Sequence, residues 1–298
     1  MMGEPLSEST TMPSHEAAVP LVARRMPTKS RLWIRALTVS VLVCVTIGVL
    51  GYLREPTGPA SGNEIQGALP NLPANQKTFR VGTLNKHSGF GEDDVYNLNR
   101  TIEAVRGTDL CGLNEVRGRL FGQPANQAQE LAQAIGDAWL YLPSERRLWH
   151  DDFGNGLLTR LPIANWIRSP LPAEPHHGGY RNVTVASVQF GSRRVEVVVT
   201  HIDRASDQSN QIQFITRLFS SLEQPSILLG DLNANSDNPQ IQNLLSIQGI
   251  HECLGEATGQ TRGRIDWILC RGLQTVSGGE IKNGASDHPM YWVDLQFP

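Results

Sequence analysis

The sequence predicts an α/β protein with a sheet-rich core, built as two packed β-sheets flanked by helices. Short apolar runs bounded by glycine, proline or polar residues recur after residue 77, which is typical of buried strands. These runs outnumber the segments with helical spacing, and the two kinds are mixed along the chain. We therefore expect one domain of mixed sheets covered by helices.

The period of the apolar residues places the individual elements. Continuous or alternating apolar runs predict strands, and apolar residues three or four positions apart predict amphipathic helices. Strands are expected at Phe79–Leu84, Asp109–Leu113, Gly156–Thr159, Ile163–Ile167, Val183–Gln189, Val195–Thr200, Ile227–Leu229, Ile265–Leu269 and Met290–Phe297, and helices around Val95–Val105, Gln127–Ala134 and Ile212–Leu222.

The N-terminal part of the chain has a different composition. Residues 1–30 are polar and unpatterned, which predicts a disordered tail. Ala36–Leu53 is an uncharged run of 18 residues between Arg35 and Arg54, and it is long enough to cross a bilayer. Basic residues gather before this run and place the N-terminus in the cytoplasm. We predict a signal-anchor over residues 31–54, a single-pass membrane protein and an extracytoplasmic C-terminal domain.

A cleaved signal peptide is the alternative to a retained anchor. Its apolar region is usually shorter, and the nearby small-residue site, Gly58-Pro59-Ala60, suits cleavage poorly. A bacterial lipidation site at Cys44 is disfavoured because the two residues before it, Leu42 and Val43, are bulky.

Two composition shifts divide the rest of the chain. Residues 55–76 are rich in proline and glycine, which predicts an extended linker. Residues 77–298 show no repeat and no second linker, so we expect a single domain and a monomer. From Gln76 onward, 20 Lys and Arg residues against 24 Asp and Glu residues give a net charge of −4. Tight nonspecific binding of polyanions is therefore not predicted, but a bound metal would change the local charge and keeps nucleic acid among the candidate substrates.

The four cysteines lack the spacing of a zinc site. Cys44 lies in the apolar run, and the other three allow at most one disulfide. Cys253 with Cys270 is one candidate pair, and three small buried thiols are the alternative.

The segment Ile227–Asn235 organises the candidate site. Its apolar residues predict a short buried strand that runs into a turn at Gly230, so Asp231 and Asn233 fall where the strand meets the loop. The ends of strands are the usual positions of reacting side chains in sheet-based enzymes. The alternative is an Asx turn, in which such side chains bond only their own backbone.

Further polar residues lie at or near the ends of predicted strands. Oxygen ligands without cysteine favour Mg²⁺ or Mn²⁺ over zinc, and the two histidines can exchange protons near neutral pH. Mg²⁺ held by few protein ligands leaves room for a substrate phosphate, so this set indicates phosphoester hydrolysis. The set is Asn85, Glu115, His201, Asp231, Asn233, Asp266, Asp287 and His288.

Seven short motifs carry these residues in a fixed order. They are Thr83-Leu84-Asn85, Gly112-Leu113-Asn114-Glu115-Val116, Gly154-Asn155-Gly156-Leu157-Leu158-Thr159-Arg160, Thr200-His201, Gly230-Asp231-Leu232-Asn233-Ala234, Arg264-Ile265-Asp266-Trp267-Ile268 and Ser286-Asp287-His288. Together they resemble the endonuclease/exonuclease/phosphatase superfamily, which includes the pancreatic-type deoxyribonucleases. The resemblance covers nearly all of Thr78–Pro298 and implies a four-layered α/β sandwich.

The resemblance also implies which residues bind metal and substrate. Glu115, with Asn85 and Asp287, would hold Mg²⁺ on the substrate phosphate. Asn155 lies within one of the matching motifs and is expected to bind substrate. Arg181 precedes a predicted strand and could meet a substrate phosphate, with a solvated loop arginine as the alternative.

The resemblance assigns the chemistry to five further residues. Asp231 would position or deprotonate the attacking water, and Asn233 would steady water and phosphate. His288, paired with Asp266, would contact the phosphate or act as the base. His201 would stabilise the developing charge on the phosphate oxygens.

Three positions depart from the usual pattern of this superfamily. Asn114 stands where glutamine is more common, and Leu84 replaces a common aromatic residue. Phe153 lies near the place of a tyrosine that touches phosphate in many members, which points to a different substrate contact.

The sequence thus predicts a membrane-anchored, Mg²⁺- or Mn²⁺-dependent phosphodiesterase whose substrate is nucleic acid or a phospholipid head group. Two alternatives stay open: a phosphomonoesterase on inositol or sugar phosphates, and a non-catalytic module that binds polyanions.

Overall fold

The computed structural model describes residues 28–70, 76–118, 125–147, 152–174, 179–260 and 262–298, so residues 1–27 of the predicted tail lie outside it. The chain divides into two units, Met1–Gly48 and Val49–Pro298. Helix α1 (Thr28–Tyr52) begins in the first unit, and its last four residues belong to the second. Within it, Arg31–Leu50 is long and apolar enough to cross a membrane, in line with the span expected from the sequence.

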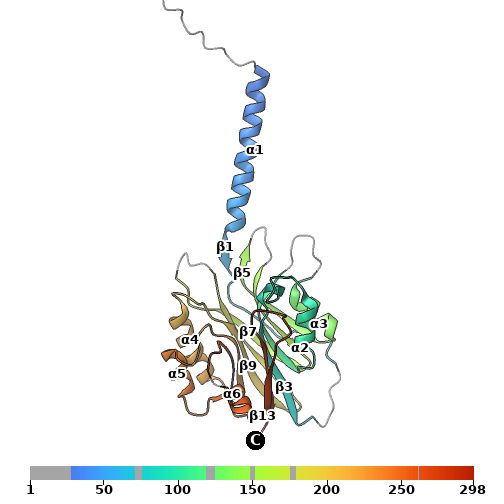
Figure 1. The fold of residues 1–298 in the computed structure, drawn as a ribbon, viewed down its shortest axis with the longest axis vertical. Coiled ribbons are helices and arrows are strands. Elements are labelled where there is room, and N and C mark those ends of the chain that lie inside the picture. The colour runs from blue at the N-terminus through green and yellow to red at the C-terminus, as the bar shows by residue number, and fades with distance from the viewer. Residues whose placement is uncertain (1–27, 71–75, 119–124, 148–151, 175–178, 261) are drawn as a thin grey trace, which may run out of the picture. The chain divides into compact units, whose positions relative to one another are not determined.

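The second unit contains two sheets of seven strands (Figure 1). In the first sheet a parallel pair, β3 and β4, lies at the centre, and Asn85 is in register with Asn114 at its carboxyl end. The order of this sheet is β1 (Arg54–Pro56), β5 (Ala138–Arg147), β6 (Phe153–Thr159), β4 (Leu110–Arg117), β3 (Thr78–Asn85), β14 (Met290–Gln296) and β13 (Gln274–Ile281).

The second sheet has the same arrangement at its centre. There β9 and β10 are parallel, and His201 is in register with Asp231 at their carboxyl ends. The order is β11 (His251–Glu252), β12 (Asp266–Arg271), β10 (Ser226–Asp231), β9 (Arg193–His201), β8 (Asn182–Phe190), β7 (Ile163–Pro170) and β2 (Ala60–Gly62).

The main core lies between the two sheets. Val81 of β3 and Leu229 of β10 belong to one cluster of fully buried side chains, in which each large apolar side chain contributes about 1.5–3 kcal/mol. The sheets approach closely at Gly112, where an added Cβ would lie 3.2 Å from the Cβ of Leu229. A larger residue at position 112 would push the sheets apart.

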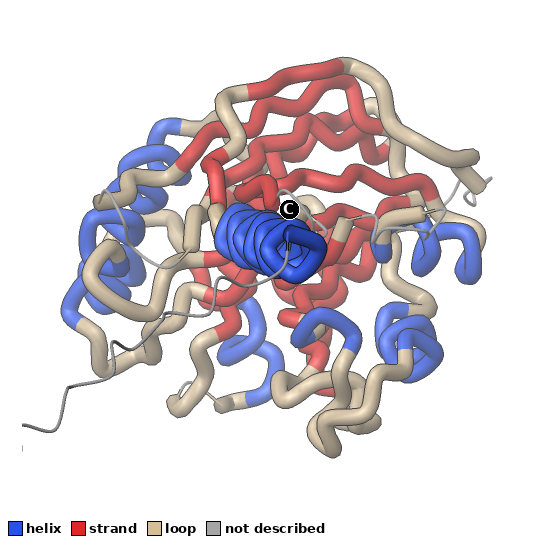
Figure 2. The backbone as a smooth tube through the Cα atoms, turned by 90° about the horizontal axis from the view of Figure 1, so that it is seen from above, coloured by secondary structure: helices blue, strands red, loops and turns tan. Residues whose placement is uncertain are grey.

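Helices cover the outer face of each sheet, and Figure 2 shows them around the strands. Apolar residues of α2 and α3 pack on the first sheet, and those of α4 and α5 pack on the second. The result is the predicted four-layered α/β sandwich. The helices are α2 (Leu98–Val105), α3 (Gln127–Ile135), α4 (Gln208–Ser221), α5 (Pro239–Leu245) and α6 (Cys253–Thr258), with a 3₁₀ turn η1 at His87–Gly89.

Residues 55–76, which we expected to form a linker, contribute to both sheets. Strand β1 pairs with β5, and β2 pairs with β7, so each sheet gains an edge strand. The buried Thr57 donates a hydrogen bond from its hydroxyl to Pro143 O over 2.6 Å, and Trp166 Nε1 donates one to Glu64 O. Proline is tolerated at such edges because its missing N–H faces away from the sheet. This segment therefore belongs to the fold.

A disulfide joins Cys253, at the start of α6, to Cys270 in β12. The sequence left open a disulfide between these two residues or three buried thiols. The structure has the disulfide, and Cys111 is a free, buried thiol. The bridge ties α6 to the second sheet.

Replacing both Cys253 and Cys270 by alanine should lower the free energy of unfolding by about 3 kcal/mol, because the bridge closes a loop with a sequence separation of 17. Urea unfolding of the double variant without reductant measures this. The Cys44→Ser variant is the control and should match the wild type, because Cys44 is exposed and is not part of a disulfide. An unchanged midpoint for the double variant would contradict a stabilising bridge.

Candidate active site

Polar side chains from the strand ends of both sheets line one cavity of about 580 Å³. The first sheet and its loops contribute Asn85, Glu115 and Asp287, and the second contributes His201 and Asp231. These residues are far apart in sequence and meet because both parallel strand pairs end at the same side of the sandwich. The other lining residues are Arg54, His87, Arg117, Glu145, Phe153, Gly179, Arg181, Asp203, Arg204, Ala205, Asn233 and His288.

One carboxylate oxygen of Asp231 bonds to the backbone, and the other faces the cavity. Oδ1 accepts a hydrogen bond of 2.7 Å from the backbone N–H of Asn233, which is the Asx turn considered from the sequence. Oδ2 accepts one of 3.0 Å from Asn85 Nδ2. The turn thus orients a carboxylate that also faces the site. Burial and then the nearby charge of Asp266 raise the pKa of Asp231 to about 7.

Glu115 lies at a bulge inside β4 and not at the end of a strand. The register of β4 with β6 shifts between Leu113 and Val116, and Glu115 has a φ of 56°. A bulge redirects a side chain, and here the carboxylate reaches the cavity. Glu115 Oε1 lies 3.4 Å from Asn85 Nδ2, so the two residues expected to bind metal are neighbours.

Asp287 and His87 form the exposed side of the cavity. Asp287 Oδ1 accepts a hydrogen bond of 3.0 Å from the Ser286 hydroxyl and lies 3.7 Å from His87 Nδ1. Glu115 and Asp287 thus bring carboxylate oxygens to one cavity, the donor type that fits a hard divalent cation. The amide oxygen of Asn85 accepts from the backbone N–H of His87, while its Nδ2 is turned toward Glu115 and Asp231.

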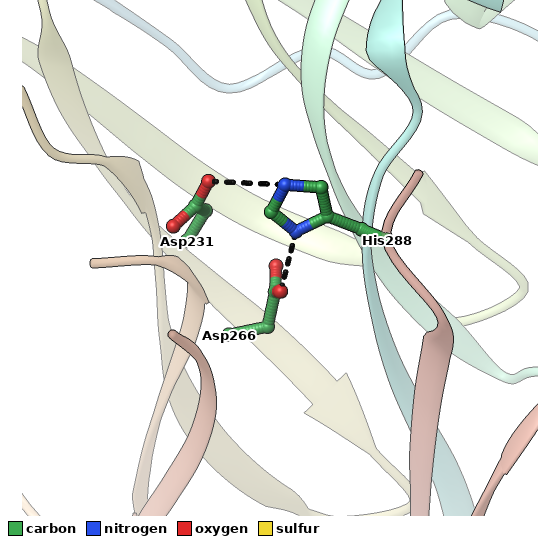
Figure 3. A group of neighbouring side chains, drawn as sticks. All are labelled: Asp231, Asp266 and His288. Carbon is green, nitrogen blue, oxygen red and sulfur yellow. Dashed lines mark hydrogen bonds and ion pairs between the residues drawn. The ribbon is translucent and has the colours of Figure 1, made fainter. Parts of the chain in front are cut away.

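His288 lies between two aspartates, as Figure 3 shows. Its Nδ1 is 2.7 Å from Asp266 Oδ2, and its Nε2 is 4.0 Å from Asp231 Oδ2. Burial acts to lower the pKa of His288, but the hydrogen bond and charge of Asp266, with the charges of Asp231 and Asp287, raise it to about 9. His288 is therefore protonated at neutral pH.

The group Asp231, Asp266 and His288 also has its ligand atoms within 4.8 Å of one another. The hydrogen bond to Asp266 occupies His288 Nδ1, so a metal ion there could take only His288 Nε2. The carboxylates of Glu115 and Asp287, on the other side of the cavity, are the second candidate place for a cation.

His201 is buried and has the opposite electrostatic setting to His288. Burial, followed by the positive charges of Arg181 and His288, lowers the pKa of His201 well below its usual value. Arg181 lies 3.0 Å from His201 Nδ1 and donates a hydrogen bond to it, because a guanidinium has no acceptor. Neutral His201 then carries its proton on Nε2, which lies 3.2 Å from Asn233 Nδ2 and 3.5 Å from Asp231 Oδ2.

The structure does not bring Asn155 into the cavity. This side chain is buried; its Oδ1 accepts from Asn114 Nδ2 over 2.8 Å, and its Nδ2 donates to Asn182 Oδ1 over 2.9 Å. In this structure its amide joins neighbouring strands. Arg181, in contrast, is a half-buried lining residue and not a solvated loop arginine.

Several lining residues were not predicted, notably Arg54, His87, Arg117 and Glu145. His87 follows the Asn85 motif by two positions, which is a usable signal. Arg54 and Glu145 meet only because β1 pairs with β5, and nothing local in the sequence indicates that pairing.

Several solved structures share this fold. The chain is similar to an endonuclease/exonuclease/phosphatase from Beutenbergia cavernae, with 20% identity, a TM-score of 0.61 and coverage of 74% of this chain and 72% of that one. The human Nocturnin catalytic domain with bound sulfate anion is 17% identical, with a TM-score of 0.59 and coverage of 74% and 94%. D. rerio TDP2 complexed with single strand DNA product is 14% identical, with a TM-score of 0.55 and coverage of 74% and 100%.

A comparison with curated proteins gave no match. The sequence profile of the endonuclease/exonuclease/phosphatase family matches residues 88–288, which is more than half of the chain. The chain belongs to this family. Its members are generally phosphoester hydrolases and typically use divalent metal ions.

Replacing Asp266 by asparagine should lower the pKa of His288 from about 9 toward its usual range, because a charged acceptor is lost. A pH titration of the His288 ring signal by NMR measures this, and Asp237→Asn, at an exposed position, should leave it unchanged. Since the folded pKa is the raised one, the pair stabilises the fold fully below about pH 6.5, and this stabilisation is lost as the pH rises through 9. An unshifted His288 signal in Asp266→Asn would contradict the pairing.

Replacing Gly230 by alanine should destabilise the fold by about 2–4 kcal/mol. Gly230 has a φ of 139°, and an added Cβ would lie 1.9 Å from Thr200 O. Gly191→Ala is the matched control, because its φ is also positive but no atom lies within 4 Å of the added Cβ. Urea unfolding should show a smaller loss for the control, about 1 kcal/mol, and equal losses would contradict a steric cause.

Proposed function

We propose that this protein is a membrane-anchored, divalent-metal-dependent phosphodiesterase that acts outside the cytoplasm. The observation that carries the proposal is the meeting of Asp231, His201 and His288 with Asn85, Glu115 and Asp287 in one cavity. These are the residue types needed for water activation, charge stabilisation and metal binding.

Glu115, Asn85 and Asp287 would hold the cation, Mg²⁺ or Mn²⁺. When bound, it would supply positive charge that polarises the phosphoryl group. Oxygen donors alone suit such a hard ion.

Asp231 is the candidate base. Its Oδ1 is fixed by the N–H of Asn233, its Oδ2 faces the cavity, and a pKa of about 7 lets it exchange a proton near neutral pH. The oxygen of water bonds to phosphorus, and the water proton passes to Asp231. The bond from phosphorus to the leaving oxygen breaks, and that oxygen takes up a proton from solvent and leaves as the alcohol.

The two histidines would differ in charge. Protonated His288, oriented by Asp266, donates a charged hydrogen bond to a phosphate oxygen. Neutral His201 points its Nε2 proton toward Asp231, and Asn233 would steady the water and the phosphate. Arg181 orients His201 and can also attract the phosphate.

Two features support export and anchoring. Helix α1 is long enough to span a bilayer, and basic residues such as Arg31 and Arg35 precede its apolar part. The Cys253–Cys270 disulfide is typical of proteins outside the reducing cytoplasm.

A phosphomonoesterase acting on multiply phosphorylated sugars is the second candidate. Little basic clustering was visible in the sequence, but the fold brings Arg54, Arg117, Arg181 and Arg204 to the cavity. Such a cluster can bind a second phosphate. The non-catalytic module remains the rival from another class.

The full-length protein in detergent should hydrolyse a phosphodiester with Mg²⁺ or Mn²⁺ and lose this activity with EDTA. Asp231→Asn and Glu115→Gln should each lower kcat by about 100-fold or more, because the base and a metal ligand are lost. Asp237→Asn is the control, since it makes the same change at an exposed position.

The substrate panel is plasmid DNA, RNA, phospholipid vesicles and inositol phosphates. Release of inorganic phosphate from inositol phosphates alone would favour the monoesterase. A folded protein that binds Mg²⁺ and cleaves none of these would sink the phosphodiesterase proposal and support the binding module.

A further inference from the structure

Arg54 connects the cavity to the end of the candidate membrane helix. It is the first residue of β1, and its side chain lines the cavity that also contains His201, Asp231 and His288. The guanidinium lies 3.9 Å from Glu145, whose side chain is 1% exposed while that of Arg54 is 43% exposed. The buried carboxylate therefore holds a cationic group at the rim, where an anion can reach it.

The path from Arg54 to the helix is very short. Helix α1 ends at Tyr52, so only Leu53 lies between it and β1. Two residues span at most about 7 Å. Strand β1 cannot lengthen this path, because Arg54 is in register with Arg147 and Pro56 with Glu145 in β5. Arg54, at the rim of the cavity, therefore cannot move far from the end of the helix.

From these contacts we propose that Arg54 binds an anionic oxygen of the substrate and that the substrate is a phospholipid head group at the surface of the bilayer that α1 crosses. This inference rests on the proposed phosphoesterase function. With α1 in a bilayer, its end lies at the interface, and the backbone of Arg54, which is within about 7 Å of that end, lies close to the head groups. A substrate held in the same bilayer reaches such a rim by lateral diffusion.

The distribution of charge favours a phospholipid substrate over a soluble nucleic acid. Arg54 lies on the edge strand β1, and the exposed Arg146 lies on β5, which pairs with it. Basic side chains beside the end of the helix attract anionic lipid at about 1 kcal/mol each. Beyond residue 76 the domain has a net charge of −4, which gives no general attraction for nucleic acid. In the reaction, water adds across one P–O ester bond of the head group, and the products are an alcohol and a phosphomonoester.

The test uses the full-length protein in vesicles of phosphatidylcholine and phosphatidylglycerol. One variant carries ten Gly and Ser residues inserted between Tyr52 and Leu53, which separates the helix from β1 without changing the cavity. A second variant is Arg54→Gln. Its matched control is Arg194→Gln, because Arg194 is also half-exposed, at 51%, and lies 3.5 Å from a mostly buried glutamate, Glu196, outside the cavity.

Three substrates are compared in the same vesicles: the vesicle lipids, a single-stranded oligonucleotide in solution, and the small soluble diester bis(p-nitrophenyl) phosphate. We expect the insertion to lower lipid hydrolysis about 10-fold while hydrolysis of the small diester stays within about 2-fold. We expect Arg54→Gln to raise the KM for lipid about 10-fold with a smaller change in kcat, and Arg194→Gln to change neither.

Any one of three results would overturn this inference and leave the proposed function intact. The first is a wild type that hydrolyses the small diester but not lipid. The second is an insertion that leaves lipid hydrolysis unchanged, and the third is an Arg54→Gln variant that behaves like Arg194→Gln. Faster cleavage of the oligonucleotide than of lipid would assign a nucleic acid substrate. Failure of the folded wild type to hydrolyse any of the three would overturn the proposed function itself, and this inference with it.

Discussion

The side chain of Asn114 joins the two sheets at the site, and the geometry of the cavity depends on it. It is fully buried in β4; its Nδ2 donates to Thr200 O of β9 over 2.9 Å, and its Oδ1 accepts from the backbone N–H of Asp231 over 2.9 Å. A buried amide with these partners is costly to disrupt, because each lost bond leaves an unsatisfied polar group. The backbone of Asp231 is thus held in place from the opposite sheet, and small shifts of one sheet against the other are resisted at the site.

Burial and neighbouring charges give two histidines in one cavity opposite protonation states. His288 has aspartates on both sides and keeps its proton, whereas His201 is buried beside a guanidinium and loses it. Asp231 lies between them with a raised pKa. The site therefore holds a proton donor, His288, a neutral histidine, His201, and a proton acceptor, Asp231. These roles come from the surroundings of ordinary residue types.

Most of the sandwich and of the site was predictable because apolar runs mark the inner strands and polar residues mark their ends. The position of Asp231 was predicted in this way, and the match of the chain to its family confirms the family assignment. The bulge at Glu115 was not predictable, since it depends on the register between β4 and β6. Asn155 was expected to bind substrate, but its side chain bonds between strands and does not line the cavity, and the sequence motif alone does not distinguish these two placements. Arg54 was missed because edge strands pair through the backbone, and proline and glycine gave no strand pattern there.

The two short strands at the start of the domain also protect two edges of the sheets. Strand β1 covers one edge of the first sheet, and β2 covers one edge of the second. A shortened chain that began at Thr78 would leave the backbone amides and carbonyls of β5 and β7 open along those edges. Open edges recruit strands from other molecules and promote aggregation. The residues that lead from the helix into the domain thus cover these edges. Removing them to obtain a more soluble fragment would instead promote aggregation.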